Sequence, residues 1–78
     1  MPRVNRCRVV AVWSPGRHLP PAVIAEEFYG GVRFTTYPDR VTPAQKEEAA
    51  AWWVGLCDGR ADHDEIWRAM WDNTESAG

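Results

Sequence analysis

Two segments of the chain have the spacing of β-strands. Residues 7–13 (CRVVAVW) form a nearly continuous apolar and β-branched run that ends at Ser14-Pro15-Gly16. Residues 32–37 (VRFTTY) alternate between two faces, and Pro38 follows them. We expect both segments to be strands. The continuous apolar run predicts that the first strand is covered on both faces toward its C-terminal end.

Three other segments are predicted to be helical. Pro20-Pro21 is expected to open a short helix that runs to Tyr29 and stops at Gly30-Gly31. A longer helix is expected from Pro43 to about Cys57. Its apolar positions fall at helical spacing, namely Ala49, Trp52, Trp53 and Leu56.

Capping residues support the two later helices. Thr42 and Gln45 are placed to form a capping box before the longer helix, and Asp58-Gly59 is a typical stop. Asp62 and Glu65 have the same spacing at the start of the last helix.

The resulting order is β-α-β-α-α. It predicts a small α+β protein, a single domain over residues 1–78 with a loose tail at about 73–78. Two strands are too few for a sheet that is stable alone, so we expect three helices to pack on a two-stranded sheet. Whether the strands are parallel stays open. The edges of such a sheet favour pairing with a partner strand or a second copy.

The length of the chain limits its stability, and its charges are unevenly distributed. A core built from 78 residues supplies only roughly 3–5 kcal/mol of stability. Residues 1–40 carry six arginines against three carboxylates, whereas residues 41–78 carry three basic against eight acidic residues.

No apolar run is long enough for a membrane span, and the first residues lack the pattern of a secretory signal. We therefore expect a cytoplasmic protein that has no contact with a membrane.

Tryptophan is the most informative residue type. The chain has five, and four lie on the last two predicted helices. Trp52 and Trp53 point roughly 100° apart on a helix, so both cannot point straight into one core. We predict a partner-binding surface on these helices, with a second choice on the second strand; its residues are Trp52, Trp53, Trp67, Trp71, Arg33 and Tyr37. The alternative is that all five tryptophans form a Trp-rich core.

The loop after the first strand is a second candidate site. If a helix follows it, Ser14, Arg17 and His18 would lie where α/β folds bind anions. The alternative is a turn stiffened by proline. No Walker or Gly-rich nucleotide motif is present.

The sequence gives little support for a metal site or a catalytic site. The candidate metal ligands lack structural-zinc spacing; they are Cys7, His18, Cys57, Asp62, His63 and Asp64. Cys57 and His63 lie on different helices, so a core thiol is favoured over a nucleophile–base pair. We predict no catalytic residues, no metal and no cofactor.

The arginines of the first half suggest an alternative partner. Arg6 and Arg8 share one face of the first strand, and Arg33 lies on the second. Together with Arg3, and with Trp13 or Tyr37 for stacking, they form a candidate nucleic-acid surface.

These observations predict a small non-enzymatic interaction or regulatory module. It would bind a protein partner, or itself as a homodimer, through the Trp-rich helical surface or a free strand edge. One specific version is a phage or mobile-element inhibitor of a host complex, such as an anti-CRISPR protein. The alternative is a nucleic-acid-binding protein that uses the arginine face, and the third hypothesis is a small enzyme with an anion site in the 14–18 loop.

Overall fold

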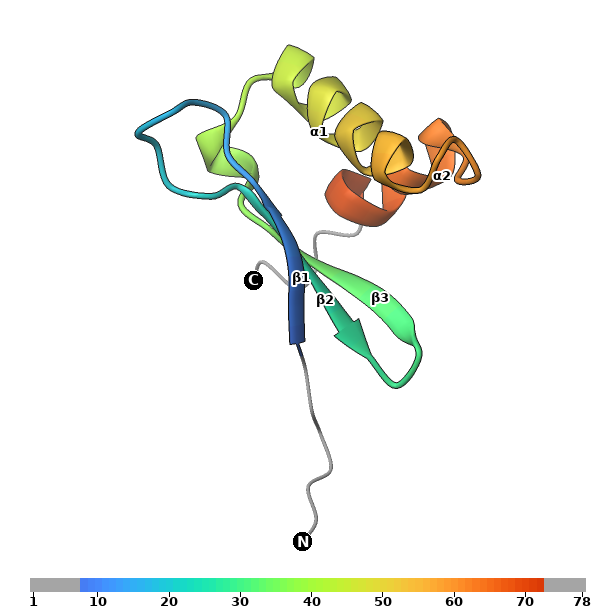
Figure 1. Ribbon diagram of the computed structural model, residues 1–78. Coiled ribbons are helices and arrows are strands. Elements are labelled where there is room, and N and C mark those ends of the chain that lie inside the picture. The colour runs from blue at the N-terminus through green and yellow to red at the C-terminus, as the bar shows by residue number, and fades with distance from the viewer. Residues whose placement is uncertain (1–7, 73–78) are drawn as a thin grey trace, which may run out of the picture.

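A computed structural model describes residues 8–72 of the 78-residue chain. Its elements are the strands β1 (Arg8–Trp13), β2 (Val23–Phe28) and β3 (Gly31–Thr36), the short 3-10 turn η1 (Pro38–Arg40), the helices α1 (Pro43–Leu56) and α2 (His63–Trp67), and the π-helical turn η2 (Arg68–Asp72) (Figure 1). The protein is a small α+β fold, as predicted. In detail, a three-stranded antiparallel sheet and two helices replace the expected two strands and three helices. Arg3, Arg6, Cys7 and the tail at 73–78 lie outside the described residues.

The predicted helix from Pro20 to Tyr29 is wrong, because residues 23–28 form the central strand of the sheet. Val23 and Ala25 are buried while Ile24 and Glu26 are only partly buried, which is the two-residue alternation of a strand. β2 is paired on both sides, with β1 and with β3. This pairing bonds its backbone to two neighbours and overrides a short apolar pattern that also fits a helix.

A two-residue turn joins β2 to β3. Tyr29 and Gly30 both have positive φ values, 52° and 81°. This is the backbone of the type I′ turn that matches the twist of a hairpin. Gly30-Gly31 therefore closes a hairpin instead of ending a helix, and Gly31 is the first residue of β3.

β1 is an edge strand of the sheet. Its pairing with β2 shifts by one residue between Val9 and Ala11, which leaves Val10 as an extra residue. Val12 is 46% exposed, so the expectation that this end of β1 is covered on both faces is wrong. The reason is that the helices cover one face of the sheet only.

The predicted caps of the helices are largely confirmed. Thr42 accepts a hydrogen bond from the Gln45 N–H, and the Gln45 side chain accepts one from the Thr42 N–H, so the capping box of α1 is complete. The Asp62 side chain accepts from the Glu65 N–H at 3.2 Å and caps α2. The expected last helix is a short α-helix that continues as the π-helical turn η2.

The core lies between one face of the sheet and the helices. Its buried cluster joins Val23 of β2 to α1 and η2, and consists of Val23, Ala49, Ala50, Met70 and Trp71. Two hydrogen bonds join η2 to its neighbours. The Thr36 hydroxyl donates to the Met70 carbonyl at 2.9 Å, and the Trp71 indole N–H donates to the Lys46 carbonyl at 3.2 Å.

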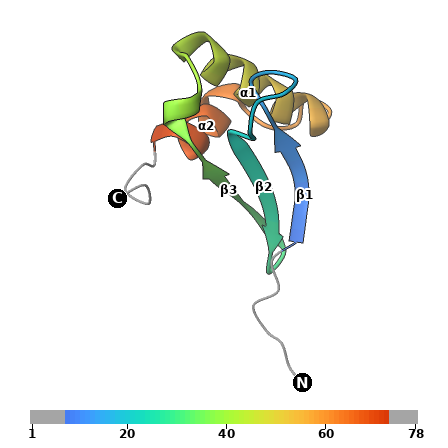
Figure 2. The same cartoon turned by 90° about the vertical axis from the view of Figure 1, so that its left-hand side faces the viewer.

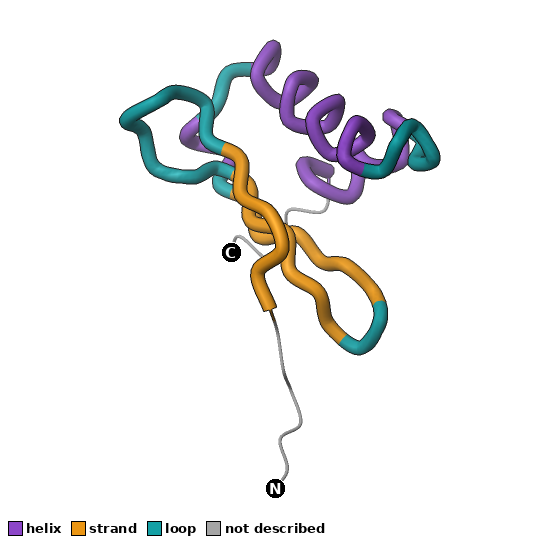
Figure 3. The backbone as a smooth tube through the Cα atoms, in the orientation of Figure 1, coloured by secondary structure: helices purple, strands orange, loops and turns teal. Residues whose placement is uncertain are grey.

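The helices do not cover the whole length of the sheet. Figure 2 shows them over the ends of the strands that lie opposite the β2–β3 turn. The hairpin therefore extends away from the helical layer, as the tube in Figure 3 also shows. None of the helices within residues 8–72 has the length and apolar character needed to cross a membrane.

The size of the core makes stability sensitive to Met70. This side chain is 1% exposed and is one of the two largest that are fully buried among the described residues. Met70→Ala is expected to cost about 2–5 kcal/mol, comparable with the whole stability of so small a core. Far-UV circular dichroism during urea unfolding measures the loss. Leu56→Ala, at a 56% exposed position, is the control and should leave the midpoint nearly unchanged; equal midpoints for both variants would contradict this core.

Candidate interaction surface

The tryptophans of the helices belong to the core and its margin. Trp71 is 3% exposed, so its expected place on a surface is wrong. Trp52, Trp53 and Trp67 are partly buried and pack against the buried cluster, as does Trp13 of β1. The Trp-rich core that the sequence left open as an alternative describes these side chains better.

Ring contacts hold several of them in place. The ring of Trp53 lies edge-on to Phe34 of β3, with centroids 5.2 Å apart, and 5.8 Å from the ring of Trp52. The indole N–H of Trp67 is buried, and no described residue accepts a hydrogen bond from it. The aromatic side chains therefore serve to pack α1 and α2 on the sheet.

The opposite face of the sheet also carries exposed apolar side chains. Because paired residues share a face, and Val23 and Ala25 point toward the helices, the side chains beside Ile24 point away from them. We call this the open face and define it by Val9, Val12, Ile24, Glu26, Phe28, Arg33, Thr35 and Tyr37. Val9 and Val12 are 54% and 46% exposed.

The predicted site residues therefore divide between two sides of the sheet. The four helical tryptophans lie on the covered side, whereas Arg33 and Tyr37 lie together on the open face. The sequence did not predict that Val9, Val12 and Ile24 share an open face. For Ile24 the signal is the alternation within residues 23–28, which also fits a helix.

Carboxylates of β2 offset the arginines of the sheet. Arg8 forms an ion pair with Glu27, with an N–O distance of 2.9 Å. Arg33 Nε lies 3.6 Å from Glu26 Oε1. Arg8 is paired with Glu27 on the side of Val23 and Ala25, whereas Arg33 lies on the open face, so these two arginines do not form the expected single arginine face. The net charge over the two ion pairs is zero.

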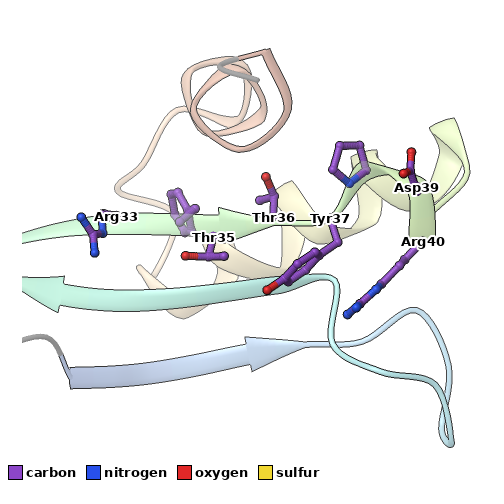
Figure 4. Close-up of a pocket in the computed structure, with 8 residues that line it drawn as sticks. Arg33, Thr35, Thr36, Tyr37, Asp39 and Arg40 are labelled. Carbon is purple, nitrogen blue, oxygen red and sulfur yellow. The ribbon is translucent and has the colours of Figure 1, made fainter. Parts of the chain in front are cut away.

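A shallow pocket of about 670 Å³ lies along the end of β3 and η1, lined by residues 33–40. In Figure 4, Thr35, Tyr37 and Arg40 project toward β2 and β1, while Thr36 and Asp39 point the other way. The Arg40 guanidinium lies 4.1 Å from the centroid of the Tyr37 ring and donates to the Pro21 carbonyl at 2.6 Å. These contacts fix Arg40 at the rim of the open face.

The structure removes the reason for predicting an anion site in residues 14–18. This loop leads into strand β2 through residues 19–22, so the helix whose N-terminus the predicted anion site required does not follow it. Arg17 and His18 are exposed and Ser14 is partly buried.

Metal ligands do not gather within residues 8–72. No group of three His, Cys, Asp or Glu side chains in this part of the chain is placed to hold a metal ion. The ring nitrogens of His63 lie 3.5 Å from Glu47 Oε1 and 3.8 Å from Asp64 Oδ1, so the imidazole faces carboxylates and not a thiol. Cys57 is a partly buried free thiol.

Comparison with known proteins gives no family assignment: no family model, no curated protein and no solved structure matches this chain.

The offset arginines lead to a prediction about nucleic acid. We expect the double variant Glu26→Gln/Glu27→Gln to bind a labelled 20-nucleotide single strand more tightly than the wild-type chain at low salt. The reason is that each substitution removes one negative charge from beside an arginine, which makes the surface more attractive to phosphates. Fluorescence anisotropy against salt concentration measures the difference. Equal affinities of the wild-type chain and the double variant at low salt would contradict it.

Proposed function

We propose that this chain is a small, non-enzymatic interaction module that binds a protein partner through the open face of its sheet. The proposal keeps the class of function expected from the sequence and moves the binding surface from the tryptophans to the sheet. The single observation that carries it is the exposure of apolar side chains on a sheet face that no described helix covers.

The composition of the open face supports a protein partner. Antiparallel sheets with one covered face usually carry polar side chains on the other. Here Val9, Val12 and Ile24 occupy neighbouring positions on β1 and β2. Exposed contiguous apolar area with a polar rim is typical of protein-binding surfaces.

The small core supports the same proposal. Four of the seven hydrophobic residues that are buried within 8–72 are alanines, which have little side-chain volume: Ala22, Ala25, Ala49 and Ala50. A domain of this size gains stability when a partner covers further apolar surface. Binding to a partner would therefore also stabilise the fold of this chain.

A second copy is the other form of this proposal. β1 has no strand on its outer edge among the described residues, and such an edge pairs readily with another chain. The register shift at Val10 interrupts that edge, which favours docking on the face over simple extension of the sheet. The narrower hypothesis of a phage or mobile-element inhibitor rests on size and acidity alone, and stays a prediction.

Val12→Glu tests the proposal directly. Val12 lies on β1 beside Ile24 of the central strand. A carboxylate at this position of the open face is expected to reduce recovery of the partner about tenfold or more in a tagged pull-down from the source cells, because burying an unpaired charge is costly. Leu56→Glu is the matched control, since Leu56 is also an exposed apolar residue, 56% against 46% for Val12, but lies at the end of α1. Thermal unfolding of both variants establishes that they fold.

Two outcomes of the pull-down decide between these possibilities. Loss of one stoichiometric protein in Val12→Glu alone supports the open face. Equal recovery with wild type and both variants rules it out. If the chain binds itself, sedimentation velocity should show the same difference between the two variants.

A further inference from the structure

Tyr29 occupies an unusual position at the tip of the β2–β3 hairpin. Its φ of 52° lies in the left-handed region, where a bulky side chain is a genuine outlier. Asn, Asp and Gly are the residues that a type I′ turn favours at its first position. The other non-glycine residue with positive φ in residues 8–72 is Asp58, which this region tolerates well. Tyr29 therefore stands where a small residue would be less strained.

Burial does not account for this choice of residue. The side chain of Tyr29 is 73% exposed, the highest value among the large hydrophobic residues exposed in the described chain. Its ring contacts Phe28, with centroids 4.4 Å apart, so its neighbour in the chain orients it. The hairpin that carries it extends away from both helices (Figure 1). The strained residue is thus presented to the outside and does not fill the core.

The tip is continuous with the open face. Phe28 shares the side of Ile24 and Glu26 on β2, and the Arg33 guanidinium lies 5.1 Å from the centroid of its ring. Tyr, Phe and Arg are the residue types enriched where protein interfaces bind most strongly. A partner seated on the open face would therefore meet Tyr29 at one end of the contact.

The shape and charge of the tip define what it fits. An exposed aromatic ring at the tip of a hairpin fits a concave, mostly apolar pocket. Glu26 and Glu27 of the same hairpin form ion pairs with Arg33 and Arg8, so these four residues carry no net positive charge that would attract a phosphate backbone. A protein pocket suits the tip better than a nucleic acid does.

We propose that Tyr29 is the anchor by which this module inserts into an apolar pocket of its protein partner, held outward by a strained turn. This inference rests on the proposed function, because it needs a protein partner on the open face. The turn keeps a conformation that disfavours tyrosine, so stability and binding should respond to Tyr29 in opposite directions.

The first experiment uses the full-length chain alone. Tyr29→Asn should raise the midpoint of thermal unfolding by a few degrees, because asparagine suits the left-handed position. Tyr29→Phe keeps the ring and should leave the midpoint unchanged. A clear fall in the midpoint of Tyr29→Asn would overturn the proposal, because it would make the ring a structural element.

The second experiment locates the partner. The photoreactive residue p-benzoylphenylalanine replaces Tyr29, Val12 or, as a control, Leu56 in the source cells. We expect positions 29 and 12 to cross-link to the same protein and position 56 to give none. Tyr29→Asn should reduce co-purification of that protein about tenfold or more, whereas Tyr29→Phe should reduce it less.

The outcomes separate the two proposals. Cross-links from position 12 with none from position 29 overturn the anchor and leave the open face intact. Cross-links from neither position overturn both. Cross-links from position 29 to nucleic acid overturn the anchor as a protein contact.

Discussion

The structure depends on the attachment of one short segment, the π-helical turn η2, to both of its neighbours. The Met70 carbonyl accepts from Thr36 of β3, and the Trp71 indole donates to the Lys46 carbonyl of α1. Met70 and Trp71 are also the largest residues of the buried cluster. The same two residues thus supply hydrogen bonds and apolar contact, and they hold α1 and the sheet together around a core that is otherwise built from small side chains.

This attachment explains why the sheet has one covered and one open face. The large aromatic side chains of α1 and α2 are used to fill the space on the covered side, where Trp53 packs on Phe34. No described element remains to cover Val9, Val12 and Ile24 on the other side. Interaction through the open face, and through Tyr29 at its end, follows as a proposal from this one-sided packing.

Elements with their own local signals could be predicted from the sequence. The capping box of Thr42 and Gln45 fixes the start of α1. The apolar run of β1 and the alternating pattern of β3 identify both strands. β2 could not be identified in this way, because its apolar residues also fit a helical face and its pairing partners lie elsewhere in the chain. The hairpin signal was also hidden, since its turn is Tyr-Gly and not the usual Asn-Gly.

The candidate site was harder to predict for a related reason. A helical wheel shows which way Trp52 and Trp53 point, but not how wide the core is that receives them. Trp52 and Trp53 are both partly buried because α1 lies across one end of the sheet. The central strand of this sheet, β2, was predicted to be a helix, so the surface that receives the two rings could not be predicted. Arg33 and Tyr37 were chosen from their own strand pattern, and these two do lie together on the open face.

Amide hydrogen exchange of the full-length chain, alone and with its partner bound, tests the central claim most directly. Exchange is read for each peptide by mass spectrometry. We expect the partner to slow exchange in residues 8–13 and 28–33, and to leave 43–56 and 63–72 nearly unchanged. Protection confined to the two helical segments would contradict the open face and return the interaction to the tryptophans.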